Sequence, residues 1–354
     1  MHPLTSSIKK NTYDYVMEKL PHHLKVALFH PDTAAEDAGT VMILSSFSTV
    51  SLEDVRAAAP ACLLWQQTYI FRDRTITQSL VERAAARGFS AIVVTADSPV
   101  YGDGVQRHAY AYDLRRGLSF ANVEAAVPNG FKACKTRDEY TCLLDPLPSA
   151  TWDDIEWLRS LSKLPVVVKG VLTAEAALAA HRHGAAAVIV SNHGGRQLDG
   201  TPATIDVLPE VVAAVGNKME VYLDSGVRTG ADVVKALALG ARMVFVGRPV
   251  LWGLAYDGKQ GVDKVFQILR QELERTMQLI EMLDLYKIKS NVEWTSWQAN
   301  GGGNLANHWV FANRCPLYGE RHVVLGGIYN YDIHSAHWLS NKAALKLTLP
   351  KISA

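Results

Sequence analysis

Residues 165–200 read PVVVKGVLTAEAALAAHRHGAAAVIVSNHGGRQLDG, and this stretch decides the fold class. It opens with an apolar run at Val166–Val168, continues with a helical pattern at Thr173–Gly184, and ends with a second apolar run at Ala187–Val190. Runs that are apolar at nearly every residue are typical of strands buried on both faces, as in a parallel sheet. The helical pattern begins with a threonine, a good N-cap, and ends with a glycine, a common stop. The stretch therefore predicts a β-α-β unit with a right-handed crossover.

The same alternation of apolar runs and helical patterns extends from about residue 41 to residue 282. The other predicted strands are Val41–Leu44, Cys62–Trp65, Ala91–Val94, Val221–Leu223 and Met243–Val246. The other predicted helices are Ser51–Ala59, Thr75–Gly88, Trp152–Ser162, Ile205–Gly216 and Gly230–Gly240. This pattern predicts an α/β protein with a (β/α)8 TIM barrel, although only seven strands are clear and the barrel needs eight. The one candidate for a first strand, Leu24–Phe29, precedes a segment too short for an outer helix, so we expect the first strand–helix unit to be missing or replaced.

The chain accordingly divides into three parts. Residues 1–29 form an atypical N-terminal segment, residues 30–283 the barrel, and residues 284–354 a C-terminal appendage. The appendage is rich in tryptophan and glycine and lacks a helix or strand rhythm, so we expect it to lie outside the barrel. Gly102–Ala150 is long and aperiodic, and we expect it to form a lid after the fourth barrel strand.

Composition argues against several classes of partner. The formal net charge is +1, which gives no long-range field to attract nucleic acid or a membrane surface. No apolar run approaches the roughly 20 residues of a membrane span, and Met1–Leu20 is too polar for a signal peptide. The four cysteines lack metal-ligand spacing, so we expect no metal site and a reduced, intracellular protein.

The turns after the last two predicted strands point to a phosphate. One turn combines Gly226 with Arg228, and the next combines Gly247 with Arg248. In barrels the active site lies at the C-terminal strand ends, and phosphate is commonly held after strands seven and eight. Glycines let backbone N–H groups approach an anion, and arginine adds bidentate hydrogen bonds. Either turn alone is equally consistent with a tight turn beside a surface charge, but the two together favour a phosphate site.

Two further strand ends point to a redox cofactor and a general base. Lys169 follows three valines, and a buried lysine needs a negative partner, such as a reduced flavin near N1 and O2. A Schiff-base lysine and a structural ion pair are the alternatives. His193 lies in a glycine-rich turn, with Asp97 as an orienting carboxylate and Arg196 as a group that binds a substrate carboxylate. A histidine with an acidic partner is a suitable base, although a lone histidine is more often structural.

Residues from about His30 to Met282 resemble the FMN-dependent 2-hydroxy acid oxidases, and most of all the animal enzymes. The most specific stretches are SNHGGRQLDGTPATIDVLPE from Ser191, DSGVRTGADVVKALALGA from Asp224 and VGRPVLWGLA from Val246. The match is extended by LWQQTYIFRDRTIT from Leu64 and AIVVTADSP from Ala91. The resemblance implies oxidation of a small 2-hydroxy acid to the 2-oxo acid, with FMN as cofactor, oxygen reduced to hydrogen peroxide, and a homotetrameric assembly.

The resemblance also implies roles for individual positions. His193 matches the catalytic base, Asp97 the carboxylate that steadies it, Tyr69 the active-site tyrosine and Arg196 the arginine that binds the substrate carboxylate. The positions that match flavin contacts are Ser45, Gln67, Thr95, Lys169 and Ser191. The positions that match the ribityl and phosphate site are Asp224, Ser225, Gly226, Arg228, Gly247 and Arg248.

Four departures from the family pattern leave competing functions open. The first strand and its tyrosine lack a counterpart in residues 1–29, and Gly104 stands where the family has a second substrate-binding arginine. Phe47 replaces the usual tryptophan, and Lys351–Ala354 is not the terminal tripeptide of the family's peroxisomal members. An active oxidase is therefore weighed against a non-catalytic relative, such as a truncated isoform or regulatory subunit, and against a flavoprotein that passes electrons to a carrier.

Overall fold

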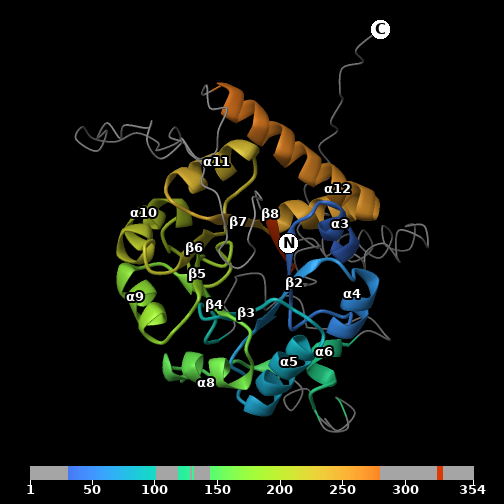
Figure 1. Ribbon diagram of the computed structural model, residues 1–354, viewed down its shortest axis with the longest axis vertical. Helices are drawn as coiled ribbons and strands as arrows, with labels where there is room; N and C mark the ends of the chain where they lie inside the picture. Colours follow the sequence, from blue (N-terminus) through green and yellow to red (C-terminus); the bar gives the residue numbers. More distant parts are fainter. Residues whose placement is uncertain (1–30, 101–118, 128–129, 131–143, 280–324, 330–354) are drawn as a thin grey trace, which may run out of the picture.

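The computed structural model describes residues 31–100, 119–127, 130, 144–279 and 325–329. In this part of the chain, parallel strands form a closed barrel surrounded by helices (Figure 1). The strands are β1 (Val41–Leu44), β2 (Leu63–Thr68), β3 (Ala91–Thr95), β4 (Val166–Val171), β5 (Ala187–Val190), β6 (Glu220–Leu223), β7 (Met243–Val246) and β8 (Leu325–Tyr329). The helices are α3 (Pro31–Asp37), α4 (Leu52–Ala58), α5 (Arg74–Ala86), α6 (Ala121–Glu124), α8 (Asp153–Leu161), α9 (Ala174–Arg182), α10 (Thr204–Val215), α11 (Gly230–Ala238) and α12 (Arg248–Leu279). The predicted α/β barrel is confirmed.

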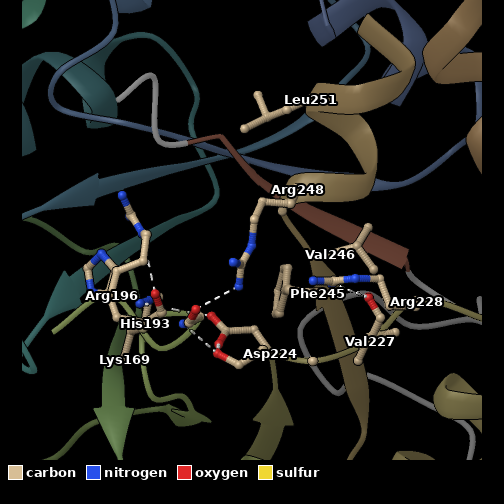
Figure 2. A pocket seen from close by; sticks show the side chains of 14 residues that line it. Lys169, His193, Arg196, Asp224, Val227, Arg228, Phe245, Val246, Arg248 and Leu251 are labelled. Carbon is tan, nitrogen blue, oxygen red and sulfur yellow. Dashed lines mark hydrogen bonds and ion pairs between the residues drawn. The ribbon is translucent and has the colours of Figure 1, made fainter. Parts of the chain in front are cut away.

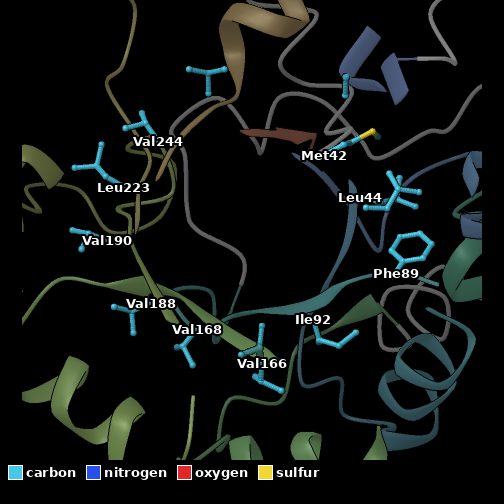
Figure 3. Packing of buried hydrophobic residues seen from close by; sticks show 14 of the residues in the cluster. Met42, Leu44, Phe89, Ile92, Val166, Val168, Val188, Val190, Leu223 and Val244 are labelled. Atoms are coloured by element: carbon cyan, nitrogen blue, oxygen red, sulfur yellow. The ribbon is translucent and has the colours of Figure 1, made fainter. Parts of the chain in front are cut away.

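Strands β1 to β7 are apolar at most positions because both of their faces are buried. Alternate residues such as Val166 and Val168 point outward and pack against the surrounding helices (Figure 3). The residue between them, Val167, belongs to a second cluster that fills the barrel interior. Trp65, Tyr222 and Phe245 are the bulkiest side chains of that interior, with ring centroids 5.7–6.1 Å apart. The barrel is therefore a packed core, and ligands can enter only at its ends.

The helices are fixed by local capping as well as by packing. The Thr173 hydroxyl accepts a hydrogen bond from the backbone N–H of Ala176 at the start of α9, as the sequence predicts. Thr229 and Asp232 form a complete capping box at the start of α11. Helix α12 begins at Arg248, directly after the last sequence-predicted strand, and is interrupted at Asp257 and Gly258.

Strand β8 corrects the predicted division of the chain. It lies between β7 and β1 and pairs with both in parallel, for example Val244 with Leu325 and Ile43 with Ile328. The prediction that residues 284–354 lie outside the barrel is therefore wrong for Leu325–Tyr329. The rest of that range, and Leu24–Phe29, lie outside the described residues. The first strand–helix unit is replaced: a strand from the C-terminal segment completes the sheet.

Three other expectations can be compared only with the residues that the structure describes. Most of the predicted lid, Gly102–Ala150, lies outside them, but α6 within this range packs against α5, where Arg83 donates to the Asn122 carbonyl at 3.0 Å. Among the described helices none is long and apolar enough to cross a membrane. The same residues contain no cluster of three or more metal-binding side chains.

Candidate active site

A cleft opens at the C-terminal ends of β4 to β7 (Figure 2). Most of the predicted site residues line it, namely Lys169, His193, Arg196, Asp224, Ser225, Gly226, Arg228, Gly247 and Arg248. The parallel strands thus bring together side chains that are far apart in the sequence.

His193 and Asp97 form a buried hydrogen-bonded pair at the edge of this cleft. The His193 Nδ1 atom lies 2.7 Å from Asp97 Oδ1. His193 has a left-handed backbone, with φ of 58°, and its N–H donates to the Ser191 hydroxyl at 3.1 Å. This uncommon conformation for a residue other than glycine projects the imidazole toward Asp97 and is typical of functional turns.

The charges around the pair keep the base neutral and the acid ionised. Burial, together with the ammonium of Lys169, lowers the pKa of His193 to about 4, against the opposing effect of Asp97. Burial raises the pKa of Asp97, but Lys169 and the His193 hydrogen bond outweigh it and hold this pKa at about 2. At neutral pH His193 can therefore accept a proton, and the Asp97 carboxylate can stabilise the resulting imidazolium.

Gly170 permits the close approach of Asp97. Its φ of 105° is unfavourable for other residues, and a side chain there would have its Cβ 2.6 Å from the Cβ of Asp97. The residue lies where the pairing register between β4 and β5 shifts, between Lys169 and Val171. Glycine at this position is a requirement of the site that the sequence analysis did not single out.

Lys169 provides a buried cation with unused hydrogen-bonding capacity. Its ammonium lies 3.6 Å from Asp97 Oδ2 and 3.9 Å from Asp224 Oδ2. Lys169 therefore forms ion pairs with both carboxylates, as the alternative of a structural ion pair predicts. Neither Lys169 Nζ nor Asp97 Oδ2 has a hydrogen-bond partner among the described residues. A buried ammonium normally fills its donors, so its position beside the cleft fits a ligand that offers an acceptor.

Arg228 and Arg248 lie in the other part of the cleft, and the positive charge of Arg196 also acts on Arg248. Arg248 starts α12 and donates to the Gly194 carbonyl at 2.6 Å, while Arg228 lies with its guanidinium carbon 4.9 Å from the centre of the Trp252 ring. Burial, followed by the positive charges of Arg228 and Arg196, lowers the pKa of Arg248. Like charges gathered beside a helix N-terminus indicate a site for an anion such as a phosphate.

Asp224 and Ser225 connect the two halves of the cleft. The Ser225 hydroxyl donates to Asp224 Oδ1 at 2.6 Å and accepts the N–H of Gly194 at 2.9 Å. Ser225 has a φ of 73°, and burial raises the pKa of Asp224. The turn after β6 is thereby fixed to the turn after β5, next to the arginines.

The remaining predicted flavin contacts form a buried polar chain at the ends of β1, β2 and β3. Gln67 accepts the N–H of Ser46 at 3.0 Å and donates to the Thr95 hydroxyl at 3.0 Å, and the Ser45 hydroxyl accepts the N–H of Phe47 at 3.1 Å. These side chains belong to the same barrel end but do not line the cleft in Figure 2. Their hydrogen bonds fix the ends of β1, β2 and β3 relative to one another.

Tyr69 lies apart from the cleft in an aromatic cluster. Its ring is 5.4 Å from that of Phe47, in a stacked arrangement, and 5.8 Å from that of Phe71. Phe47, which stands where the family has a tryptophan, therefore packs directly against the predicted active-site tyrosine, Tyr69. Gly104 lies outside the described residues.

Comparisons with known proteins agree with this site. Residues 22–295 match the family model described as FMN-dependent dehydrogenase. The chain belongs to the FMN-dependent 2-hydroxy acid oxidase family. It is 46% identical over 269 residues to 2-hydroxyacid oxidase 1 of Mus musculus, which covers 73% of this chain and 72% of the relative. It is also 46% identical over 265 residues to L-lactate oxidase of Nostoc sp., with the same coverage of each chain.

Solved structures of this family have the same fold. A mandelate oxidase with benzoyl-formic acid superposes with a TM-score of 0.63 at 38% identity, over 72% of this chain and 69% of that one. A mandelate oxidase variant with a monooxide FMN adduct gives a TM-score of 0.58, also at 38% identity, over 72% of each chain. The family membership inferred from the SNHGGRQLD and VGRP stretches is thus confirmed.

Proposed function

We propose that this chain binds FMN and oxidises a small 2-hydroxy acid to the corresponding 2-oxo acid, with oxygen as the electron acceptor. The observation that carries the proposal is the buried His193–Asp97 pair, placed beside a cleft that holds Lys169 and three arginines. A base, a carboxylate-binding cation and an anion-binding turn at one barrel mouth are the parts that this reaction needs.

The residues of the cleft fit FMN. Arg228 and Arg248, with the glycines of their turns, would hold the phosphate, and Asp224 with Ser225 would bind the ribityl hydroxyls. Lys169 has unfilled donors that suit the N1 and O2 acceptors of the ring, and Ser45, Gln67, Thr95 and Ser191 would contact the remaining ring edge. When bound, FMN accepts the electron pair of the substrate's α C–H bond and afterwards passes it to oxygen.

The chain's own residues would bind the substrate and move its proton. Arg196 lies three residues after His193 and donates to its carbonyl at 3.3 Å, so a carboxylate bound there would place the adjacent hydroxyl near the imidazole. His193 Nε2 would accept the hydroxyl proton, and Asp97 would stabilise the imidazolium. The family resemblance implies that Tyr69 contacts the substrate; Tyr69 does not line the cleft, so this contact would need a substrate that extends beyond the lining residues. A homotetramer and a peroxisomal location are further expectations from the resemblance.

A catalytically impaired relative is the second candidate, and the replacement of the first strand by β8 is the observation that favours it. A single experiment separates the two. The purified chain is reconstituted with FMN, and glycolate, lactate or a longer 2-hydroxy acid is added without oxygen. Bleaching of the flavin absorbance, followed by peroxide formation on aeration, supports the oxidase.

His193→Gln is the matched variant for this experiment. It should keep the flavin but lower the rate of bleaching by about 10²–10⁴-fold, the usual contribution of a general base. Stable flavin binding without bleaching by any of these acids would favour the impaired relative. Bleaching with a steady-state rate that does not depend on oxygen would instead favour a carrier as the electron acceptor.

A further inference from the structure

Ser98 places a buried hydroxyl beside the His193–Asp97 pair. Its Oγ lies 3.2 Å from His193 Nδ1 and 3.3 Å from Asp97 Oδ1. The Gln197 side-chain amide also donates a hydrogen bond to this hydroxyl. Ser98 is 4% exposed, so these contacts are made in a nearly dry environment where hydrogen bonds have larger effects.

The hydrogen atoms of this network have one consistent arrangement. Gln197 Nε2 is only a donor, so Ser98 Oγ accepts from it and has a single hydrogen to give. If that hydrogen went to His193 Nδ1, this nitrogen would be unprotonated, and its 2.7 Å contact with the Asp97 carboxylate would bring two lone pairs together. Nδ1 therefore carries its own proton for Asp97, and Ser98 donates to Asp97 Oδ1.

One carboxylate oxygen thus accepts from both His193 and Ser98. A second donor on Asp97 Oδ1 spreads the negative charge that would otherwise act on the imidazole alone, and it fixes the carboxylate in place. Gln197 lies in the same turn as His193, whereas Ser98 follows β3, so the contact also ties the two turns together.

We propose that Ser98 and Gln197 are positioning residues that hold the Asp97 carboxylate against His193 and limit how readily His193 takes up a proton. This inference rests on the proposed function in that His193 is the base. The other charged groups that face His193 are Lys169 on β4 and Arg196 in its own turn. Substitution of Ser98 leaves both of them in place, so a change in His193 can be attributed to the hydroxyl.

The test measures the protonated fraction of His193 directly. The full chain, with and without FMN, is labelled with ¹⁵N-histidine, and the His193 signals are assigned by their loss in His193→Gln. With a pKa of about 4, His193 should be about one-tenth protonated at pH 5. Ser98→Ala should raise this fraction to about one half, because the loss of one hydrogen bond corresponds to about one pH unit.

Matched variants separate this effect from simple destabilisation. Ser98→Thr keeps the hydroxyl and should restore the protonated fraction of the unmodified chain. Ser160→Ala removes an exposed serine hydroxyl on α8 that, among the described residues, donates to the Trp157 carbonyl, and it should change nothing. Gln197→Met should shift His193 in the same direction as Ser98→Ala but by less. In turnover experiments, the acid limb of the pH profile of kcat/KM should move to higher pH in Ser98→Ala, by the same interval of about one pH unit.

The outcomes distinguish this inference from the proposed function. An unchanged His193 signal in Ser98→Ala overturns the inference, whether or not the enzyme turns over. An unchanged signal in Gln197→Met, with Ser98→Ala shifted, overturns the role of Gln197. If the NMR shifts occur but no 2-hydroxy acid is oxidised, the proposed function fails while the control of His193 by Ser98 stands.

Discussion

The low pKa of His193 makes the stability of the folded chain depend on pH in a window that can be calculated. Burial and the Lys169 ammonium lower this pKa to about 4 in the folded state, whereas an unfolded chain has a histidine pKa of about 6.5. Between these values the unfolded chain binds more protons than the folded one. The contribution of His193 to the free energy of unfolding is therefore fully present above about pH 6.5 and is lost as the pH falls toward 4.

The size of this loss follows from the two pKa values. Lowering the pH from 7 to 5 should reduce the free energy of unfolding by about 2 kcal/mol through His193 alone. Asp97, with a pKa of about 2, has its effect below this window: its stabilising contribution is lost only as the pH falls from about 4 to about 2. The two groups of the pair can thus be separated by the choice of pH.

The assay is urea unfolding of the flavin-free chain at pH 7 and pH 5, for the unmodified protein and for His193→Gln. The decline in unfolding free energy between the two pH values should be about 2 kcal/mol smaller in the variant. His181→Gln, in helix α9 away from the barrel mouth, is the matched control and should retain the full decline. Equal declines in the unmodified chain and in His193→Gln would refute the assignment of a neutral, buried His193.

Three other substitutions or deletions test other parts of the site and fold. Arg248→Met should weaken FMN binding by about 10- to 100-fold, measured by flavin fluorescence titration, because one charge-assisted bond to the phosphate is lost; unchanged affinity would place the phosphate elsewhere. Ser225→Ala should lower the free energy of unfolding in urea by about 1–3 kcal/mol, because it loses two hydrogen bonds while the left-handed backbone remains. Ser225→Gly loses the same hydrogen bonds but relieves the backbone strain, so it should lower the free energy of unfolding by less. Deletion of residues 325–354 removes β8 and exposes the edges of β1 and β7, so Tm should fall by about 5 °C or more in thermal unfolding; an unchanged Tm would mean that β8 does not close the barrel.

The positions of seven barrel strands, β1 to β7, were predictable from the sequence because these strands are buried on both faces. That burial requires apolar residues at consecutive positions, as in Val166–Val168 and Ala187–Val190, and such runs stand out from the helical patterns between them. The position of the site was predictable for a related reason. Parallel strands bring all their C-terminal ends to one mouth, so polar residues directly after the runs, such as Lys169 and His193, had to meet there.

Other features were decided only by tertiary structure, because they depend on pairing between residues far apart in the chain. Strand β8, with the sequence LGGIY, has two adjacent glycines, which are disfavoured in strands. This segment is a strand because it pairs in parallel with β7 and β1. Ser98 meets His193 and Gln197 across 95 and 99 residues, and no local pattern marks that contact. Local periodicity determines which segments become strands and helices, while closure of the barrel and the partners of each polar group are set by packing in three dimensions.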